Sequence, residues 1–205
     1  MLNTDELCPN CAHGSQSVVG HGYRASTISY HQENHMQTPD EPTWERLTQL
    51  TATTRSYAPT RFILAIASLV DADAIRGAVT TVDLAGPTVW TSVLVTDTAL
   101  CRVSASFDAE HFDREEESQQ QFRYNAPAMT LTEAWTRPLA SVREISIADV
   151  SGEIDRQKWY RVAGMKLILD DGKQIELPDQ GRLHDTRERE QSDEFLTAVR
   201  RGVSF

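Results

Sequence analysis

The stretch "GMKLILDDGKQIELP", residues 164–178, says more about the fold than any other part of this sequence. Asp171-Gly172 favours a tight β-hairpin turn, because both central residues of such a turn take positive φ angles. The residues on both sides of it alternate between apolar and polar, which is typical of strands with one solvated face. We therefore predict an antiparallel hairpin that joins "MKLILD" to "KQIELP".

The strand pattern continues upstream of this hairpin. A second hairpin is predicted in "VLVTDTALCRVS", residues 93–104, with strands over 89–96 and 99–107 on either side of Asp97-Thr98. Three further stretches, 128–135, 141–150 and 159–170, are also predicted to be strands. The acidic segment 108–121 between them is predicted to be a solvated loop or a charged helix.

An amphipathic helix is predicted near the end of the chain. Asp185 followed by Glu188 is typical of a capped helix start, and Gly202 is typical of a helix end. Between these positions one apolar stripe recurs at helical spacing. Its members are Phe195, Leu196, Val199 and Val203.

Residues 43–78 are predicted to be a helical segment. The first helix covers about 44–55, and Pro59 is a suitable start for the second. The apolar run 62–70 is also compatible with a buried strand, because periodicity alone does not separate the two; we favour the helix. The stretch "DADAIRGA", residues 71–78, is expected to extend or restart this helix, and Gly77 to end it.

The two hairpins, followed by "EQSDEFLTAVRRGV" (residues 190–203), resemble the bacterial branch of the pleckstrin-homology-like superfold. The resemblance covers about 89–203 and implies an α+β fold, in which a C-terminal helix plugs a curled antiparallel sheet or partial barrel. Lipid-binding members cluster Lys and Arg around the first hairpin, where this chain has Thr96-Asp97-Thr98 and only Arg102 nearby. The implied ligand is therefore a protein, bound along an exposed sheet edge.

This reading gives three parts: a polar Cys/His segment with a linker at 1–42, the helical segment at 43–78, and a pleckstrin-homology-like domain at 79–205. The first part contains Cys8-x2-Cys11 and His31-x3-His35. Zinc prefers four such ligands in a tetrahedral arrangement, and histidines four apart share one face of a helix. We predict a structural zinc site at Cys8, Cys11, His31 and His35.

The spacing leaves alternatives to this zinc site. Residues 12–30 separate the two pairs, which is longer than the about twelve residues of a typical zinc finger. His13 and His21 are competing ligands. The segment could instead be a disordered tail with two free thiols, or Cys8 and Cys11 could be a redox pair, although no strand–helix unit adjoins them. Cys101, inside a predicted strand, is expected to be a small buried side chain.

The composition limits the classes of partner. The 205 residues have a formal net charge of −10, which disfavours nucleic acid and anionic membranes. A zinc-containing nucleic-acid-associated regulator remains an alternative, in which the zinc segment and the helices over 44–78 bind the nucleic acid and Arg24, Arg46, Arg55 and Arg61 contact phosphates. The longest apolar run, residues 62–70, is too short to span a bilayer. The sequence has no signal-peptide pattern, and its three cysteines do not suggest a disulfide framework. We therefore predict a cytoplasmic protein.

Catalytic patterns are weak. The acidic run 108–117 with His111, and the pair His184-Asp185, are the candidates, but a solvated face and a helix cap explain them better. The sequence contains none of the common nucleophile, phosphate-loop or metalloprotease motifs. The favoured interpretation is a non-enzymatic protein-interaction or scaffold module. A thiol-disulfide oxidoreductase is a third alternative.

Overall fold

The computed structural model describes residues 38–54, 56–119, 125–151, 161–178 and 185–203. These residues belong to one compact unit, Met36–Phe205. The unit combines antiparallel sheets with helices and ends in a helix, so the predicted α+β class is confirmed. Within the described residues the sheets remain separate and do not close into a barrel.

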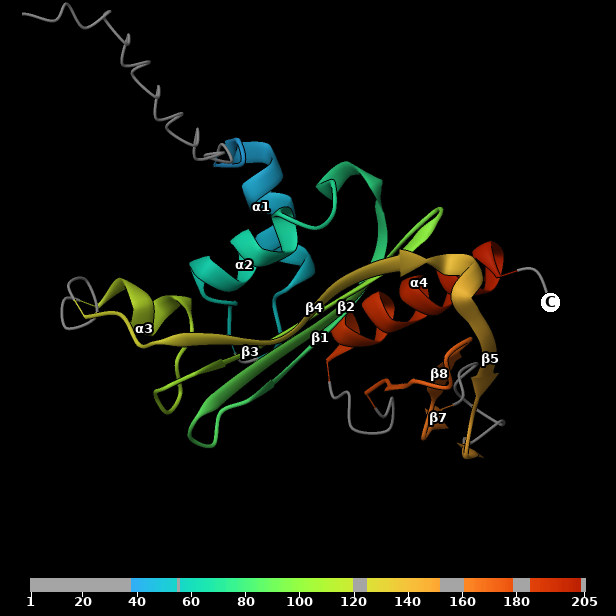
Figure 1. Ribbon diagram of the computed structural model, residues 1–205. Helices are drawn as coiled ribbons and strands as arrows, with labels where there is room; N and C mark the ends of the chain where they lie inside the picture. The colour runs from blue at the N-terminus through green and yellow to red at the C-terminus, as the bar shows by residue number, and fades with distance from the viewer. Residues whose placement is uncertain (1–37, 55, 120–124, 152–160, 179–184, 204–205) are drawn as a thin grey trace, which may run out of the picture. The chain divides into compact units, whose positions relative to one another are not determined.

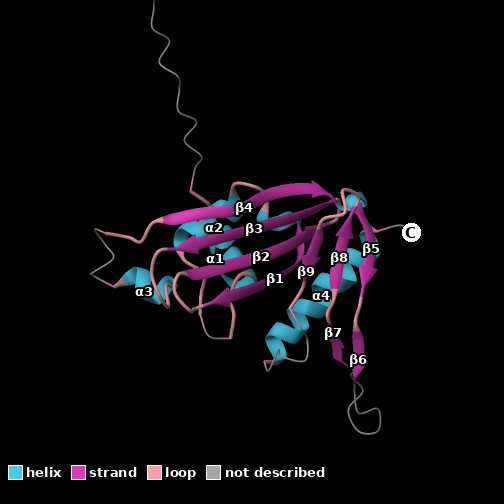
Figure 2. Ribbon diagram, turned by 60° about the horizontal axis from the view of Figure 1, so that its bottom comes forward, coloured by secondary structure: helices cyan, strands magenta, loops and turns pink. Residues whose placement is uncertain are grey.

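The first sheet is an antiparallel meander of four strands. It consists of β1 (Ile75–Asp83), β2 (Thr88–Thr96), β3 (Ala99–Phe107) and β4 (Met129–Pro138), in that spatial order (Figure 2). The predicted hairpin around Asp97-Thr98 is confirmed as β2 and β3. The prediction over 128–135 corresponds to β4, which runs three residues further.

The second sheet has three strands, β5 (Val142–Ser146), β8 (Lys166–Leu169) and β9 (Gln174–Glu176), in the order β5-β8-β9. The turn Asp171-Gly172 joins β8 to β9 as predicted, although of the two residues only Gly172 has a positive φ, at 81°. The predicted strand 159–170 is interrupted at Gly164, which has a φ of 61° and leaves β7 (Arg161–Ala163) separate from β8. β7 pairs with β6 (Asp149–Ser151).

Two helices cover one face of the first sheet: α1 (Glu41–Leu50) and α2 (Thr60–Ala67) (Figure 1). Asp40 caps α1 by accepting the Thr43 N–H at 3.0 Å. The apolar run that could have been a strand is therefore helical. Each large apolar side chain buried here contributes about 1.5–3 kcal/mol. This core layer includes Leu47, Phe62, Ile63, Ile66, Trp90, Leu94, Val103 and Phe107.

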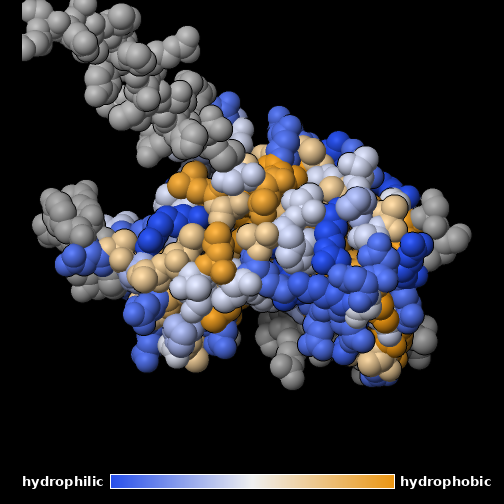
Figure 3. Space-filling model, in the orientation of Figure 1, coloured by the Kyte–Doolittle hydropathy of each residue, from blue (hydrophilic) through white to orange (hydrophobic). Residues whose placement is uncertain are grey.

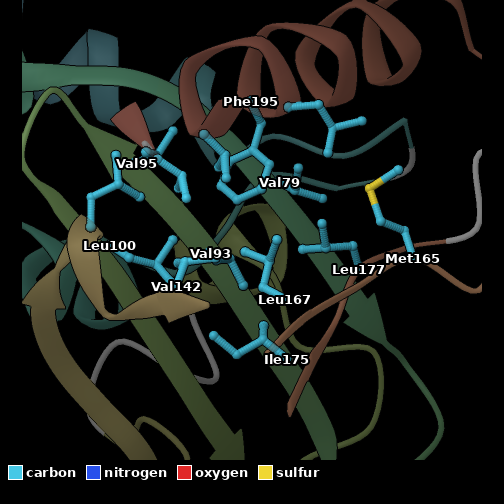
Figure 4. Close-up of a cluster of buried hydrophobic side chains, with 14 of the residues drawn as sticks. Val79, Val93, Val95, Leu100, Val142, Met165, Leu167, Ile175, Leu177 and Phe195 are labelled. Atoms are coloured by element: carbon cyan, nitrogen blue, oxygen red, sulfur yellow. The ribbon is translucent and has the colours of Figure 1, made fainter. Parts of the chain in front are cut away.

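The C-terminal helix α4 (Thr186–Gly202) packs on the opposite face of the first sheet (Figure 1). Asp185 is its N-cap, as predicted, and accepts the Arg187 N–H at 2.8 Å. The predicted apolar stripe is buried. Figure 4 shows Phe195 in one buried cluster with side chains of both sheets, among them Val79, Val93 and Leu167. Helix α4 therefore joins the two sheets through one core.

The prediction of a helix through Gly77 is wrong. A short 3₁₀ helix covers Ala72–Ala74, and β1 begins at Ile75, so a strand crosses the predicted boundary at residue 79. Gly77 does not end a helix. A Cβ atom built at Gly77 would lie 2.5 Å from the Cα of Phe195, so glycine is required for α4 to approach β1 this closely.

The acidic segment after β3 forms a loop and a short helix, α3 (Arg114–Ser118). Glu117 accepts the Thr60 N–H at 2.7 Å, at the start of α2. The Phe112 carbonyl accepts the indole N–H of Trp90 at 3.0 Å. These contacts fasten the segment to α2 and the first sheet, and they give the Glu117 carboxylate a structural partner.

Candidate functional site: the outer edge of strand β4

Strand β4 lies at one edge of the first sheet. It pairs with β3 on one side, and no strand in the described part of the chain pairs with its other side. Most of its residues are exposed, including Leu131 at 46%. At the opposite edge, α4 packs against β1 at Gly77, and the Ile75 carbonyl already accepts a hydrogen bond from Arg46 at 3.0 Å. The edge of β4 is therefore the more accessible one.

The hydrogen bonds at the end of β4 show which of its backbone groups point outward. Leu139 donates its N–H to the Thr98 carbonyl at 2.7 Å, in continuation of the register that pairs Leu100 with Arg137. Hydrogen-bonded and non-hydrogen-bonded pairs alternate along an antiparallel ladder. Glu133, Trp135 and Arg137 therefore direct their backbone groups toward β3. Ala134 and Thr136 direct theirs outward.

A β-bulge limits this edge. Ser104 faces Glu133 but Ala105 faces Leu131, so Thr132 is the extra residue, and its hydroxyl donates to the Ser104 carbonyl at 3.1 Å. Bulges and prolines are common devices that prevent indiscriminate pairing at sheet edges. With the bulge at Thr132 and Pro138 at the other end, the regular part of the edge is short. We call the outward-facing backbone groups of Ala134 and Thr136, with the side chains that flank them, the β4 edge.

Helix α2 runs alongside β4 on one face of the sheet. At its start Arg61 donates to the Pro127 carbonyl, just before β4, and beyond its end the Leu69 carbonyl accepts from the Thr136 hydroxyl at 3.3 Å. Ala65 and Leu69 are only partly buried there, as is Met129 on the strand. Figure 3 shows apolar surface gathered over α2 and the segment after it. One side of the β4 edge is therefore apolar.

The other side of the β4 edge is charged. Lys173 Nζ donates to one carboxylate oxygen of Glu133 at 2.5 Å, and Arg102 Nε lies 2.5 Å from the other as an ion pair without hydrogen-bond geometry. Arg137 Nη1 lies 2.6 Å from Asp171 Oδ2. These five residues come from β3, β4 and the β8–β9 turn, so the contacts also fasten the second sheet to the first.

Trp135 lies at the centre of these charges. The guanidinium of Arg137 is 5.1 Å from its ring centroid and Lys173 Nζ is 5.2 Å from it, both within cation–π range. Its buried indole N–H has no hydrogen-bond acceptor among the described residues. Hydrogen bonds from Arg137 and from the Lys173 backbone lower the pKa of Asp171. We call Arg102, Glu133, Trp135, Arg137, Asp171 and Lys173 the Trp135 cluster.

Two hollows elsewhere give weaker indications of a ligand. A groove of about 680 Å³ between α4, the start of β1 and the β2–β3 turn is lined by equal numbers of cations and carboxylates. Of these, Arg76 is held by Asp97 at 2.8 Å. A smaller hollow of about 260 Å³ contains the helix cap Asp185 and Glu188, which accepts the Thr54 N–H at 2.8 Å. The polar groups in both hollows are largely explained by the fold.

The predicted zinc ligands Cys8, Cys11, His31 and His35 lie outside the described residues, as does His184. The residues that the structure does describe contain no group of three or more metal-ligating side chains. The zinc site therefore stays a prediction. Cys101 is fully buried, as expected, and burial raises the pKa of its thiol, an effect that a hydrogen bond with Thr136 partly offsets.

The structure describes two of the four arginines proposed for phosphate contacts. Arg24 and Arg55 lie outside the described residues. Arg46 donates to the Ile75 carbonyl, and Arg61 donates to the Pro127 carbonyl and lies over the ring of Phe107. Because both described members hold internal partners, they give no support to a nucleic-acid interface.

Sequence reasoning predicted binding along a sheet edge without naming the strand, and it missed the Trp135 cluster. The cluster brings together three segments that are distant in sequence, so only the sheet register reveals it. None of the described helices is long and apolar enough to cross a membrane. No family model, curated protein or solved structure matches this chain.

Proposed function

We propose that this protein is a non-enzymatic interaction module that binds an extended segment of a protein partner along the β4 edge. The observation that carries the proposal is the outward direction of the Ala134 and Thr136 backbone groups on an exposed edge strand. Each outward-facing residue offers one donor and one acceptor, so an added strand gains main-chain hydrogen bonds without rearrangement of the fold.

The order of the elements supports this proposal. Antiparallel strands follow one another along the chain and are closed by helix α4. A run of antiparallel strands closed by one helix is what the resemblance over about 89–203 to pleckstrin-homology-like modules implies, and those modules are binding domains. Fold alone does not fix function, so the argument rests on the edge itself. The zinc site predicted at Cys8, Cys11, His31 and His35 belongs to the same proposal, as a structural addition in the segment that precedes the binding module in the sequence.

The test uses one substitution that blocks the edge and one that does not. Ala134→Pro removes an outward N–H that no ladder bond between described strands uses, so the fold should tolerate it. Ala134→Ser at the same position keeps the N–H. A phage-displayed library of random decapeptides is selected on the full chain, and the enriched peptides are measured by fluorescence anisotropy.

We expect the enriched peptides to bind the wild type and Ala134→Ser and to lose binding to Ala134→Pro. Circular dichroism checks that each variant is folded, and Thr136→Pro provides a second block if Ala134→Pro is not. Peptides that bind the blocked variants as tightly as the wild type, or a selection without enrichment, would refute strand addition at this edge.

A further inference from the structure

The Trp135 cluster determines what kind of segment the β4 edge can hold. In an antiparallel pairing that uses Ala134 and Thr136, the partner residue opposite Trp135 occupies a non-hydrogen-bonded position. Cβ atoms at such positions are about 4.5–5.5 Å apart, and their side chains lie on the same face of the sheet. The partner side chain therefore lies next to the indole of Trp135 and near the two cations that flank it.

The charge of the cluster favours an acidic side chain at this position. Arg102, Arg137 and Lys173 are three cations, and Glu133 and Asp171 are two carboxylates, so the cluster carries one net positive charge. The chain as a whole has a formal net charge of −10, so this local sign is the reverse of the general one. A carboxylate supplies the negative charge that complements this local excess of cations.

The other face of the partner strand would lie against apolar side chains. Its residues opposite Ala134 and Thr136 point to the face that carries α2, where Leu69 and Leu131 expose apolar surface. Successive residues of a strand point to opposite faces, so the segment must alternate between two kinds of side chain.

Resting on the function proposed above, we infer that the partner segment is a two-sided acidic strand: an Asp or Glu stands opposite Trp135, between apolar residues that face α2. The partner is thus a protein with a short extended segment of apolar–acidic–apolar pattern. An electrostatic preference of this kind gives specificity and association rate more than raw affinity.

The experiment uses the peptides enriched in the selection and adds two matched variants. Lys173→Met removes one cation beside Trp135 and keeps most of the apolar stem. Lys166→Met makes the same change on β8, where Lys166 pairs with Glu176 at 3.0 Å outside the Trp135 cluster. Each enriched peptide is also synthesised with its acidic residue changed to the corresponding amide.

We expect the enriched sequences to share one acidic position flanked by apolar residues. Both Lys173→Met and the amide change should weaken binding about fivefold, the effect of one partly exposed ion pair. Lys166→Met should leave the Kd unchanged, and the loss should be smaller at high salt.

The outcomes separate the two proposals. Peptides that require the open edge but show no acidic position, or that bind Lys173→Met as tightly as the wild type, overturn the acidic strand and leave strand addition standing. Peptides that bind Ala134→Pro normally overturn strand addition and the acidic strand with it.

Discussion

At the scale of single residues, Gly77 is the position that allows helix α4 to pack closely on strand β1. Because Gly77 has no Cβ, the backbone of α4 can come close to β1. A Cβ atom at this position would lie 2.5 Å from the Cα of Phe195, which is too short for any side chain. The sequence gives no sign of this contact, since 195 is far from 77 along the chain. From the sequence alone, a glycine after an apolar run therefore indicates a helix end.

Gly77→Ala should lower the free energy of unfolding by about 1–3 kcal/mol, because the new methyl group must displace the backbone of α4 or of β1. Urea unfolding at neutral pH measures this. Gly172→Ala is the control: its Cβ would meet nothing within 4 Å, although φ there is 81°, so the cost is that of a left-handed residue, about 1 kcal/mol. A Gly77→Ala variant as stable as the wild type contradicts the packing.

Cys101 gives a second prediction at this scale. Burial raises the pKa of its thiol and also blocks access to it, so the thiolate that reacts with alkylating reagents is scarce in the folded protein. In a Cys8→Ser, Cys11→Ser variant, Cys101 should resist iodoacetamide at pH 8 and react readily in urea. Mass spectrometry counts the adducts. Rapid alkylation without urea is the opposing result.

At the scale of elements, local sequence patterns predict whether a segment is a helix or a strand better than they predict where it begins and ends. The hairpins were predictable, because a tight turn between alternating residues is a local signal. Strand β1 was not, because its start follows directly on a run of helix-forming residues and its pairing partner β2 determines it. The edge position of β4 was equally hidden: alternation reports which face is buried, whereas an edge depends on which strand lacks a neighbour.

The edge geometry itself predicts a pattern of amide hydrogen exchange. The N–H groups of Glu133, Trp135 and Arg137 are directed to β3 and should exchange slowly, while those of Ala134 and Thr136 face outward and should exchange fast. Exchange measured residue by residue by NMR should show this alternation in the free protein. Enriched peptides should then slow Ala134 and Thr136. Uniform protection along 133–137 would mean that the edge is already occupied.

At the scale of the whole molecule, the Trp135 cluster and α4 connect the two sheets in different ways. The helix does so through a shared apolar core, and Glu133 does so through ion pairs to β3 and to the β8–β9 turn. Because Glu133 is partly buried, with 28% of its side chain exposed, removal of its charge leaves two cations close together without their common partner.

Glu133→Gln should therefore destabilise the protein by about 1–2 kcal/mol and loosen the contact between the sheets. Thermal unfolding followed by circular dichroism measures the loss. Glu176→Gln, which removes the partner of Lys166 at an exposed site, is the control and should cost much less. If the two variants melt alike, Glu133 contributes no more than a surface ion pair.

The four predicted zinc ligands precede the described residues in the sequence. If Cys8, Cys11, His31 and His35 bind one zinc ion, the purified chain should contain about one zinc and Cys8→Ser should contain almost none, because loss of one ligand of four greatly weakens a tetrahedral site. Elemental analysis by mass spectrometry measures the metal content. The described residues contain no group of three or more metal-ligating side chains, so a chelator should leave the main unfolding transition unchanged. Zinc retained in Cys8→Ser would refute this ligand set, and a shift of the main transition on chelation would place a metal in the unit that holds the β4 edge.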